Sequence, residues 1–129
     1  MKTLTLIMAA LSLAGPAAAN SPEPIPGTWL VKGKWGLLTF TLNCRFTRLG
    51  GVIGGECVDG PTNDANIKGG KRHAIRAAAL KGDQLSWTYQ TRWTVYEFDA
   101  RYSGVIRGRT MNGQMLALGK TGTFTAVRQ

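Results

Sequence analysis

Alternation of apolar and polar residues is the main pattern from Gly27 onward, and no long stretch keeps the period of an amphipathic helix. Turn signals rich in glycine separate the alternating runs. The pattern predicts eight strands, over residues 28–33, 36–48, 52–58, 72–81, 84–91, 94–109, 114–119 and 122–128. No connection is long enough for a crossover helix, so consecutive strands should pair antiparallel. The expected fold is all-β, an eight-stranded antiparallel up-and-down barrel formed by residues 27–129.

The hairpin around Gly50-Gly51 has the best-defined register in the sequence. With these two glycines as a two-residue turn, counting outward along both strands places Cys44 opposite Cys57. The position is a non-hydrogen-bonded one, where facing side chains approach most closely. The count therefore predicts a structural disulfide between the two cysteines.

The alternation also predicts which side chains face the barrel interior. In the hairpin around Gly82-Asp83, counting outward places Arg76 opposite Tyr89, on the same face as the inward Trp87. Aromatic side chains enclose apolar groups, tyrosine hydroxyls orient a polar end, and an inward arginine pairs with an anion. Alternatively, Arg76 lies at the rim and reaches water. The candidate ligand-binding residues are Arg76, Trp87, Tyr89, Tyr96, Phe98 and Tyr102.

The first residues have the features of an export signal. Lys2 precedes an apolar run, and Ala17-Ala18-Ala19 provides a small-residue cleavage motif. Residues 1–19 are therefore expected to be a signal peptide, and the proline-rich residues 20–26 an extended lead-in to the barrel. The expected location is the periplasm or the cell exterior, where disulfides persist.

The chain is basic, with 16 Lys and Arg against 7 Asp and Glu and a formal net charge of +9. The basic residues are dispersed and no nucleic-acid-binding motif occurs, so anionic surfaces are better partners than nucleic acid. One His and two Cys are too few for a Cys/His metal cluster. We expect no cofactor, no metal and no enzymatic activity, with His73 at the surface and residues 59–72 as a mobile loop at the barrel mouth.

A short motif opens the first strand, and an arginine lies near the end of the last one. The G-x-W motif ending at Trp29, together with Arg128 and the strand count, resembles the calycins, which include lipocalins, fatty-acid-binding proteins, avidins and small bacterial lipocalin-like proteins. The resemblance covers residues 27–128. It implies that the first and last strands pair, that Trp29 packs against Arg128, and that the barrel interior binds a ligand.

Two functions follow from these patterns. The first is an exported, non-enzymatic protein that holds a small apolar or amphipathic ligand, which can be anionic, in its barrel, with an anionic membrane surface as a further partner. The chain is also similar to small periplasmic metalloprotease inhibitors, disulfide-linked barrels whose N-terminal segment enters the protease cleft. The alternative function is therefore a protease inhibitor that acts through residues 20–26. A protruding segment would favour inhibition, and an aromatic lining favours a ligand.

Overall fold

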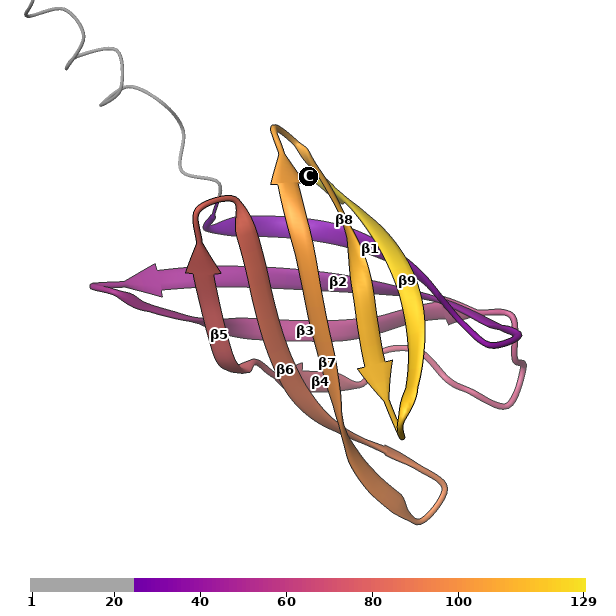
Figure 1. Ribbon diagram of the computed structural model, residues 1–129. Helices are drawn as coiled ribbons and strands as arrows, with labels where there is room; N and C mark the ends of the chain where they lie inside the picture. The colour runs from indigo at the N-terminus through magenta and orange to yellow at the C-terminus, as the bar shows by residue number, and fades with distance from the viewer. Residues whose placement is uncertain (1–24) are drawn as a thin grey trace, which may run out of the picture.

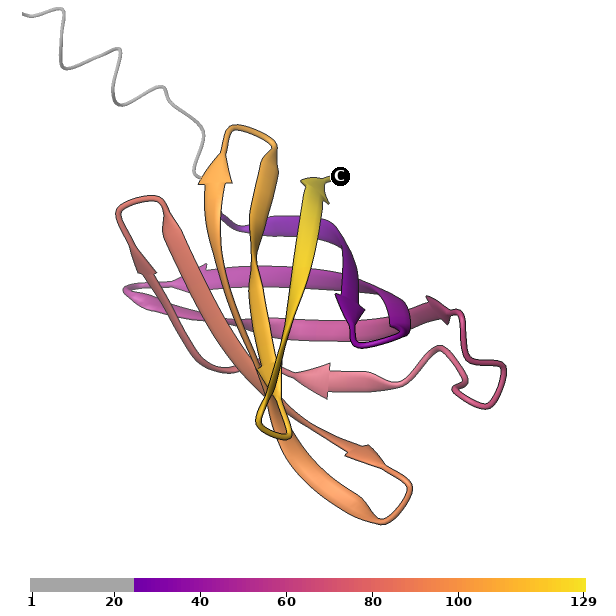
Figure 2. The same cartoon turned by 45° about the vertical axis from the view of Figure 1, so that its right-hand side comes forward.

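The computed structural model of the protein describes residues 25–129. The predicted signal peptide (residues 1–19) and most of the predicted lead-in (residues 20–26) lie outside the described residues. The described chain folds as one nine-stranded antiparallel sheet that curls into a nearly closed barrel (Figure 1 and Figure 2). Its strands are β1 (Gly27–Trp35), β2 (Leu38–Leu49), β3 (Val52–Thr62), β4 (Arg72–Ala74), β5 (Arg76–Lys81), β6 (Gln84–Trp93), β7 (Tyr96–Arg107), β8 (Thr110–Ala117) and β9 (Lys120–Arg128).

Nearly every strand lies beside its neighbours in the chain, as in an up-and-down meander, and the ends of the meander meet. The strand order is β4-β3-β2-β1-β9-β8-β7-β6-β5, so β1 pairs with β9. In this pairing Trp29 lies opposite Arg128. The guanidinium of Arg128 also donates a hydrogen bond to the carbonyl oxygen of Pro26. The first and last strands are thereby joined at one end of the barrel.

The strand count differs from the expected eight because the predicted strand 72–81 is interrupted. Its first part, β4, pairs with β3, and its second part, β5, pairs with β6. Between them, the N–H of Ile75 donates to the carbonyl oxygen of Gly55 at 2.9 Å, and Ala77 has a positive φ of 49°. The chain thus leaves β3 and joins β6 within a few residues. β4 and β5 are the two edges of the sheet, which is why the barrel is nearly closed.

The interruption between β4 and β5 also changes the register expected for Arg76. The β5–β6 ladder is irregular between Arg76 and Ala79, so Arg76 lies opposite Thr88 and not opposite Tyr89. Its side chain is about half exposed and pairs with Asp99 at 2.6 Å. The expectation that Arg76 faces the interior was therefore wrong.

One strand begins earlier than the sequence predicts. It was expected to start at residue 114, but β8 begins at Thr110 and includes Asn112 and Gly113. Gly113 lies opposite Gly104 in β7, where a Cβ on Gly113 would be 2.0 Å from the carbonyl oxygen of Ser103. Glycine is needed at this position for the close approach of two strands.

Large side chains fill one end of the barrel, and Trp87 lies at their centre. Its ring contacts Phe46 and Phe124 edge to face, with centroids 5.1 and 5.6 Å apart. It stacks on Tyr102 at 4.9 Å with an interplanar angle of 3°. Ile25 is fully buried in the same core, so the chain is anchored just before β1. We call this part of the barrel the closed end.

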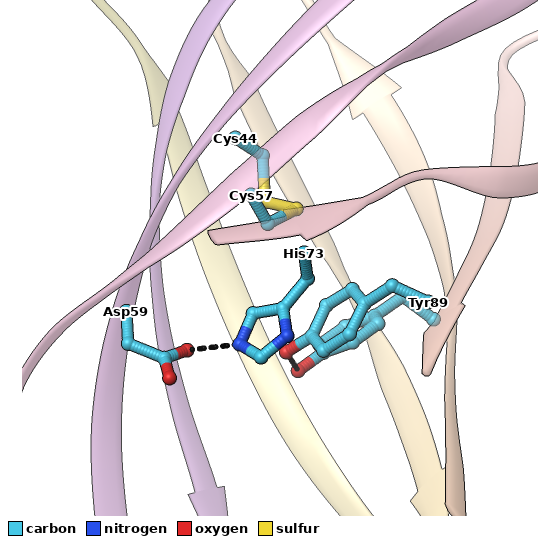
Figure 3. The surroundings of a disulfide bond; sticks show 6 residues. Cys44, Cys57, Asp59, His73 and Tyr89 are labelled. Atoms are coloured by element: carbon cyan, nitrogen blue, oxygen red, sulfur yellow. Dashed lines mark hydrogen bonds and ion pairs between the residues drawn. A yellow bond between two sulfur atoms is a disulfide. The ribbon is translucent and has the colours of Figure 1, made fainter. Parts of the chain in front are cut away.

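The predicted disulfide between Cys44 and Cys57 is confirmed. The two residues face each other across β2 and β3, and both are fully buried (Figure 3). The bond joins two strands that the hairpin already pairs. It therefore locks a register that alternation and turn geometry specify.

Loss of the disulfide should lower the stability of the barrel. The bond links residues 13 apart in sequence, so the double variant Cys44→Ala/Cys57→Ala should lose roughly 3 kcal/mol of unfolding free energy on the loop-entropy estimate. Denaturant unfolding measures this loss, and reduction of the unaltered protein should produce a similar shift. A loss below about 1 kcal/mol would contradict a stabilising role.

Replacing Ala77 by glycine should stabilise the protein. A side chain at positive φ carries a steric cost that glycine lacks, so Ala77→Gly should raise the unfolding free energy by about 0.5–1 kcal/mol. The matched control is Ala79→Gly in the same strand, where φ is not positive and glycine should cost about 0.5–1 kcal/mol. Denaturant melts of both variants should shift in opposite directions.

Candidate functional site

The end of the barrel opposite the closed end contains an open cavity of about 1180 Å³. Four connections surround its mouth: the β1–β2 turn, residues 63–71, the β6–β7 turn and the β8–β9 turn. In Figure 1 and Figure 2 these connections lie at the right and at the bottom of the barrel, away from the C-terminus. The interior is therefore filled at one end and hollow at the other.

The wall of the cavity is mainly apolar. Its inward side chains come from β2, β7 and β8, and they are Phe40, Leu42, Phe98, Ala100, Met115 and Ala117. Alanines occupy inward positions in this half, whereas tryptophans occupy inward positions at the closed end. The interior of a barrel of this size is only just wide enough for large side chains to fill it. Small side chains in this half therefore leave a cavity.

Two tyrosines form the floor of the cavity. The hydroxyls of Tyr89 and Tyr102 are 3.0 Å apart, and both side chains are almost completely buried. One hydroxyl donates to the other, and no hydrogen bond uses the second proton among the described residues. Because Tyr102 also stacks on Trp87, the floor is the upper layer of the closed-end core. The floor thus offers one O–H donor to the cavity.

His73 is buried beside this floor, which corrects the expectation of a surface histidine. It lies opposite Cys57 in the β3–β4 pairing, so the short strand β4 turns it inward. Its Nε2 is 3.0 Å from the Oδ1 of Asp59 (Figure 3). Its ring stacks on Tyr89 with centroids 4.6 Å apart and an interplanar angle of 16°. His73 and Asp59 extend the polar floor as a hydrogen-bonded pair.

The connection from β3 to β4 lies at the mouth, as expected, but it is shorter than the predicted mobile loop of residues 59–72, because β3 continues to Thr62 and β4 begins at Arg72. Hydrogen bonds hold it at both ends. The N–H of Asp59 donates to the carbonyl oxygen of Lys71, and the N–H of Gly70 donates to that of Asp59. The side-chain amide of Asn63 donates to the carbonyl oxygen of Leu37 at 2.9 Å. This connection therefore forms a fixed part of the cavity wall.

Burial keeps both floor tyrosines protonated. Loss of hydration raises the pKa of Tyr89 well above its ordinary value, and the neighbouring Tyr102 and the charge of Asp59 raise it further. The pKa of Tyr102 is also raised, chiefly by burial and despite the hydrogen bond from Tyr89, which lowers it. The tyrosine pair is thus a neutral hydrogen-bonding group over the physiological pH range.

Half of the candidate residues reach the cavity. Tyr89, Phe98 and Tyr102 line it, whereas Trp87 lies in the closed-end core beneath the floor. Tyr96 was expected inside but is 66% exposed, because β6 and β7 extend beyond the barrel as a hairpin. Arg76 is on the outer face. Phe40 and Leu42 also line the cavity, and the alternation of apolar and polar residues before Cys44 is the signal that identifies them. Nothing in the sequence links Asp59 to His73, which are 14 residues apart.

Two tryptophans and a lysine connect three of the turns at the mouth. The ring of Trp35 meets that of Trp93 edge to face, with centroids 6.4 Å apart. The indole N–H of Trp35 donates to the carbonyl oxygen of Lys120 at 3.0 Å, and the Lys120 ammonium lies 5.3 Å from the Trp35 ring. The mouth therefore has an aromatic rim next to a positive charge.

Comparisons with known proteins do not identify a family. No known protein-family description matches the chain, and no curated protein matches it significantly. Within residues 25–129, no three His, Cys, Asp or Glu side chains gather in a way that could hold a metal ion. The same part of the chain contains no helix that is long and apolar enough to cross a membrane. The function must therefore be inferred from the site itself.

The floor tyrosines should resist ionisation until the protein unfolds. In a Tyr96→Phe variant, which keeps only Tyr89 and Tyr102, the tyrosinate absorbance should not rise as the pH passes about 10. Unfolded tyrosines ionise there while the folded pair holds its protons, so the unfolding free energy should fall as the pH rises above about 10. A gradual ionisation in the folded protein at this pH would contradict the buried pair.

Proposed function

We propose that this protein is an exported, calycin-like barrel that binds a small, mainly apolar molecule without transforming it. The observation that carries the proposal is the open cavity with an apolar wall and a hydrogen-bonding floor. Its volume of about 1180 Å³ lies just above the range of most small-molecule sites, which is roughly 300–1,000 Å³. A ligand can therefore enter deeply and bury most of its surface.

The floor selects for the chemistry of the inner end of the ligand. The Tyr89–Tyr102 pair provides a neutral O–H donor, and the carboxylate of Asp59 lies nearby. With Arg76 on the outer face, the floor of the cavity has no lysine or arginine among the described residues to pair with an anionic inner group. A carbonyl, ether or hydroxyl oxygen suits this floor best. An amphipathic ligand would place an anionic group at the mouth, beside Lys71 and Lys120.

Two features support the calycin-like assignment and export. The meander closes through β1 and β9, with the G-x-W motif at the start of β1 and Arg128 opposite its tryptophan. The buried Cys44–Cys57 disulfide suits an oxidising compartment such as the periplasm or the cell exterior. The strand closure supports the calycin-like assignment, and the disulfide supports a protein that works outside the cytoplasm.

The alternative, protease inhibition through residues 20–26, involves two described residues. Ile25 is buried in the core and Pro26 accepts a hydrogen bond from Arg128. An inhibitory segment would therefore have to end before Ile25. This anchoring favours the cavity as the functional site, and capture of a secreted protease in a pull-down would reverse that preference.

Filling the cavity should abolish ligand binding. Ala117 faces the cavity from β8, so Ala117→Phe should weaken binding about tenfold or more, and Ala117→Leu should have a smaller effect. The control Thr121→Phe adds the same ring to the exposed outer face of β9 and should leave affinity unchanged. Native mass spectrometry of protein isolated from its own compartment would show whether a small molecule copurifies.

A matched set of probes would test the inner end of the ligand. We expect 2-decanone to bind about 2–10-fold more tightly than decane, since one hydrogen bond to the floor contributes about 0.5–1.5 kcal/mol. The double variant Tyr89→Phe/Tyr102→Phe, which removes both hydroxyls, should remove this preference without abolishing decane binding. If Ala117→Phe and Thr121→Phe bind every probe as the unaltered protein does, the cavity is not the binding site.

A further inference from the structure

The three two-residue turns at the mouth share a feature that those at the closed end lack. Each mouth turn has an apolar residue: Leu37 in β1–β2, Val95 in β6–β7 and Leu118 in β8–β9. Leu37 is 93% exposed and Val95 is 81% exposed. The turns at the closed end contain only glycine, aspartate and arginine, as Gly50-Gly51, Gly82-Asp83 and Gly108-Arg109. Turn residues are usually polar, so apolar residues in all three mouth turns mark the mouth as an interaction surface, whereas at the closed end the exposed Leu49 and Val52 flank only one of the three turns.

Backbone strain at one tip strengthens the point. Leu118 has a positive φ of 52°, a conformation that glycine or asparagine would adopt at lower cost. A leucine held at a strained, half-exposed tip does not improve the packing of the barrel. It fits a role in contact with an apolar partner.

The side chains around the tips are those suited to a lipid–water boundary. Trp93 and Tyr96 flank the β6–β7 turn and are both exposed, and such rings prefer the level of lipid headgroups. Lys68, Lys71 and Lys120 line the mouth and form no ion pair among the described residues. Positive side chains beside apolar tips complement a negatively charged membrane.

We infer that the mouth end of the barrel docks on an anionic phospholipid bilayer, with the tips Leu37, Val95 and Leu118 inserted among the headgroups. Separate tips around an opening can enter a fluid layer independently, whereas a folded protein partner would need one surface complementary to all of them. Docking in this orientation turns the cavity mouth towards the acyl chains. An apolar molecule could then pass between bilayer and barrel without crossing water.

Vesicle cosedimentation tests the inference on protein recovered from the periplasm of an expression host. The protein should bind vesicles of phosphatidylglycerol and phosphatidylcholine, and raised salt should weaken binding. The double variant Leu37→Ser/Val95→Ser should lower the partition coefficient about tenfold or more. Replacing Lys68, Lys71 and Lys120 by glutamine should lower it about fivefold for each lysine.

The matched control is Leu49→Ser/Val52→Ser at the tip of the β2–β3 hairpin. These residues are 81% and 72% exposed but lie at the closed end, so their loss should leave vesicle binding unchanged. An equal loss in the control, no loss in the mouth variant, or no binding to anionic vesicles would overturn the inference. Equal binding to pure phosphatidylcholine would overturn the choice of an anionic surface.

The docking surface and the cavity can fail independently. Ala117→Phe should bind vesicles normally while losing 2-decanone, and Val95→Ser/Leu118→Ser, whose residues do not line the cavity, should bind 2-decanone normally while losing vesicles. The exposure of both tips means that their replacement should not affect folding, which circular dichroism and thermal melts would check. The pattern across these two variants identifies which proposal is wrong if either one fails.

Discussion

The stack of aromatic rings around Trp87 determines what the rest of this barrel can do. Trp87 packs between Phe46 and Phe124 and fills the closed end, and Tyr102 lies flat on its upper face. The boundary between the hydrophobic core and the polar floor therefore lies between the stacked rings of Trp87 and Tyr102. Tyr102 positions Tyr89 through their hydroxyls, and the whole floor rests on rings that have little room to move. A rigid floor of this kind costs little further ordering when a ligand arrives.

Much of this architecture is predictable from local pattern. Alternation with a period of two residues identifies the inward side of each long strand, and along β2 it puts Phe40 and Leu42 on the same face as the buried Cys44. Where a glycine turn also fixes the register, the prediction extends to single pairs, as it does for Cys44 and Cys57. Fold class, meander topology and disulfide follow from these two rules.

The remainder depends on features that local pattern does not encode. The run of alanines around Ala77 carries no sign of which residue adopts a positive φ, and that one residue splits a strand and turns Arg76 outward. His73 is buried beside Asp59, a diagonal neighbour that the pairing of β4 with β3 brings near, and no short turn fixes the register of that pairing in the sequence. Tyr96 has the alternation of an inward residue, but β6 and β7 extend beyond the barrel at this position. Its side chain therefore has no barrel interior to face and is exposed.

Both described ends of the chain lie at the closed end, where Ile25 is buried and the N–H of Gln129 donates to the carbonyl oxygen of Thr28. In Figure 1 the C-terminus and the start of β1 lie far from the mouth. Attachment of the protein by either end, to a solid support, to a second domain or to a fluorescent label, would leave the opening unobstructed and pointing away from the point of attachment. The two ends of the barrel therefore differ in use: the closed end is suited to attachment of the protein, and the open end to entry and release of a ligand.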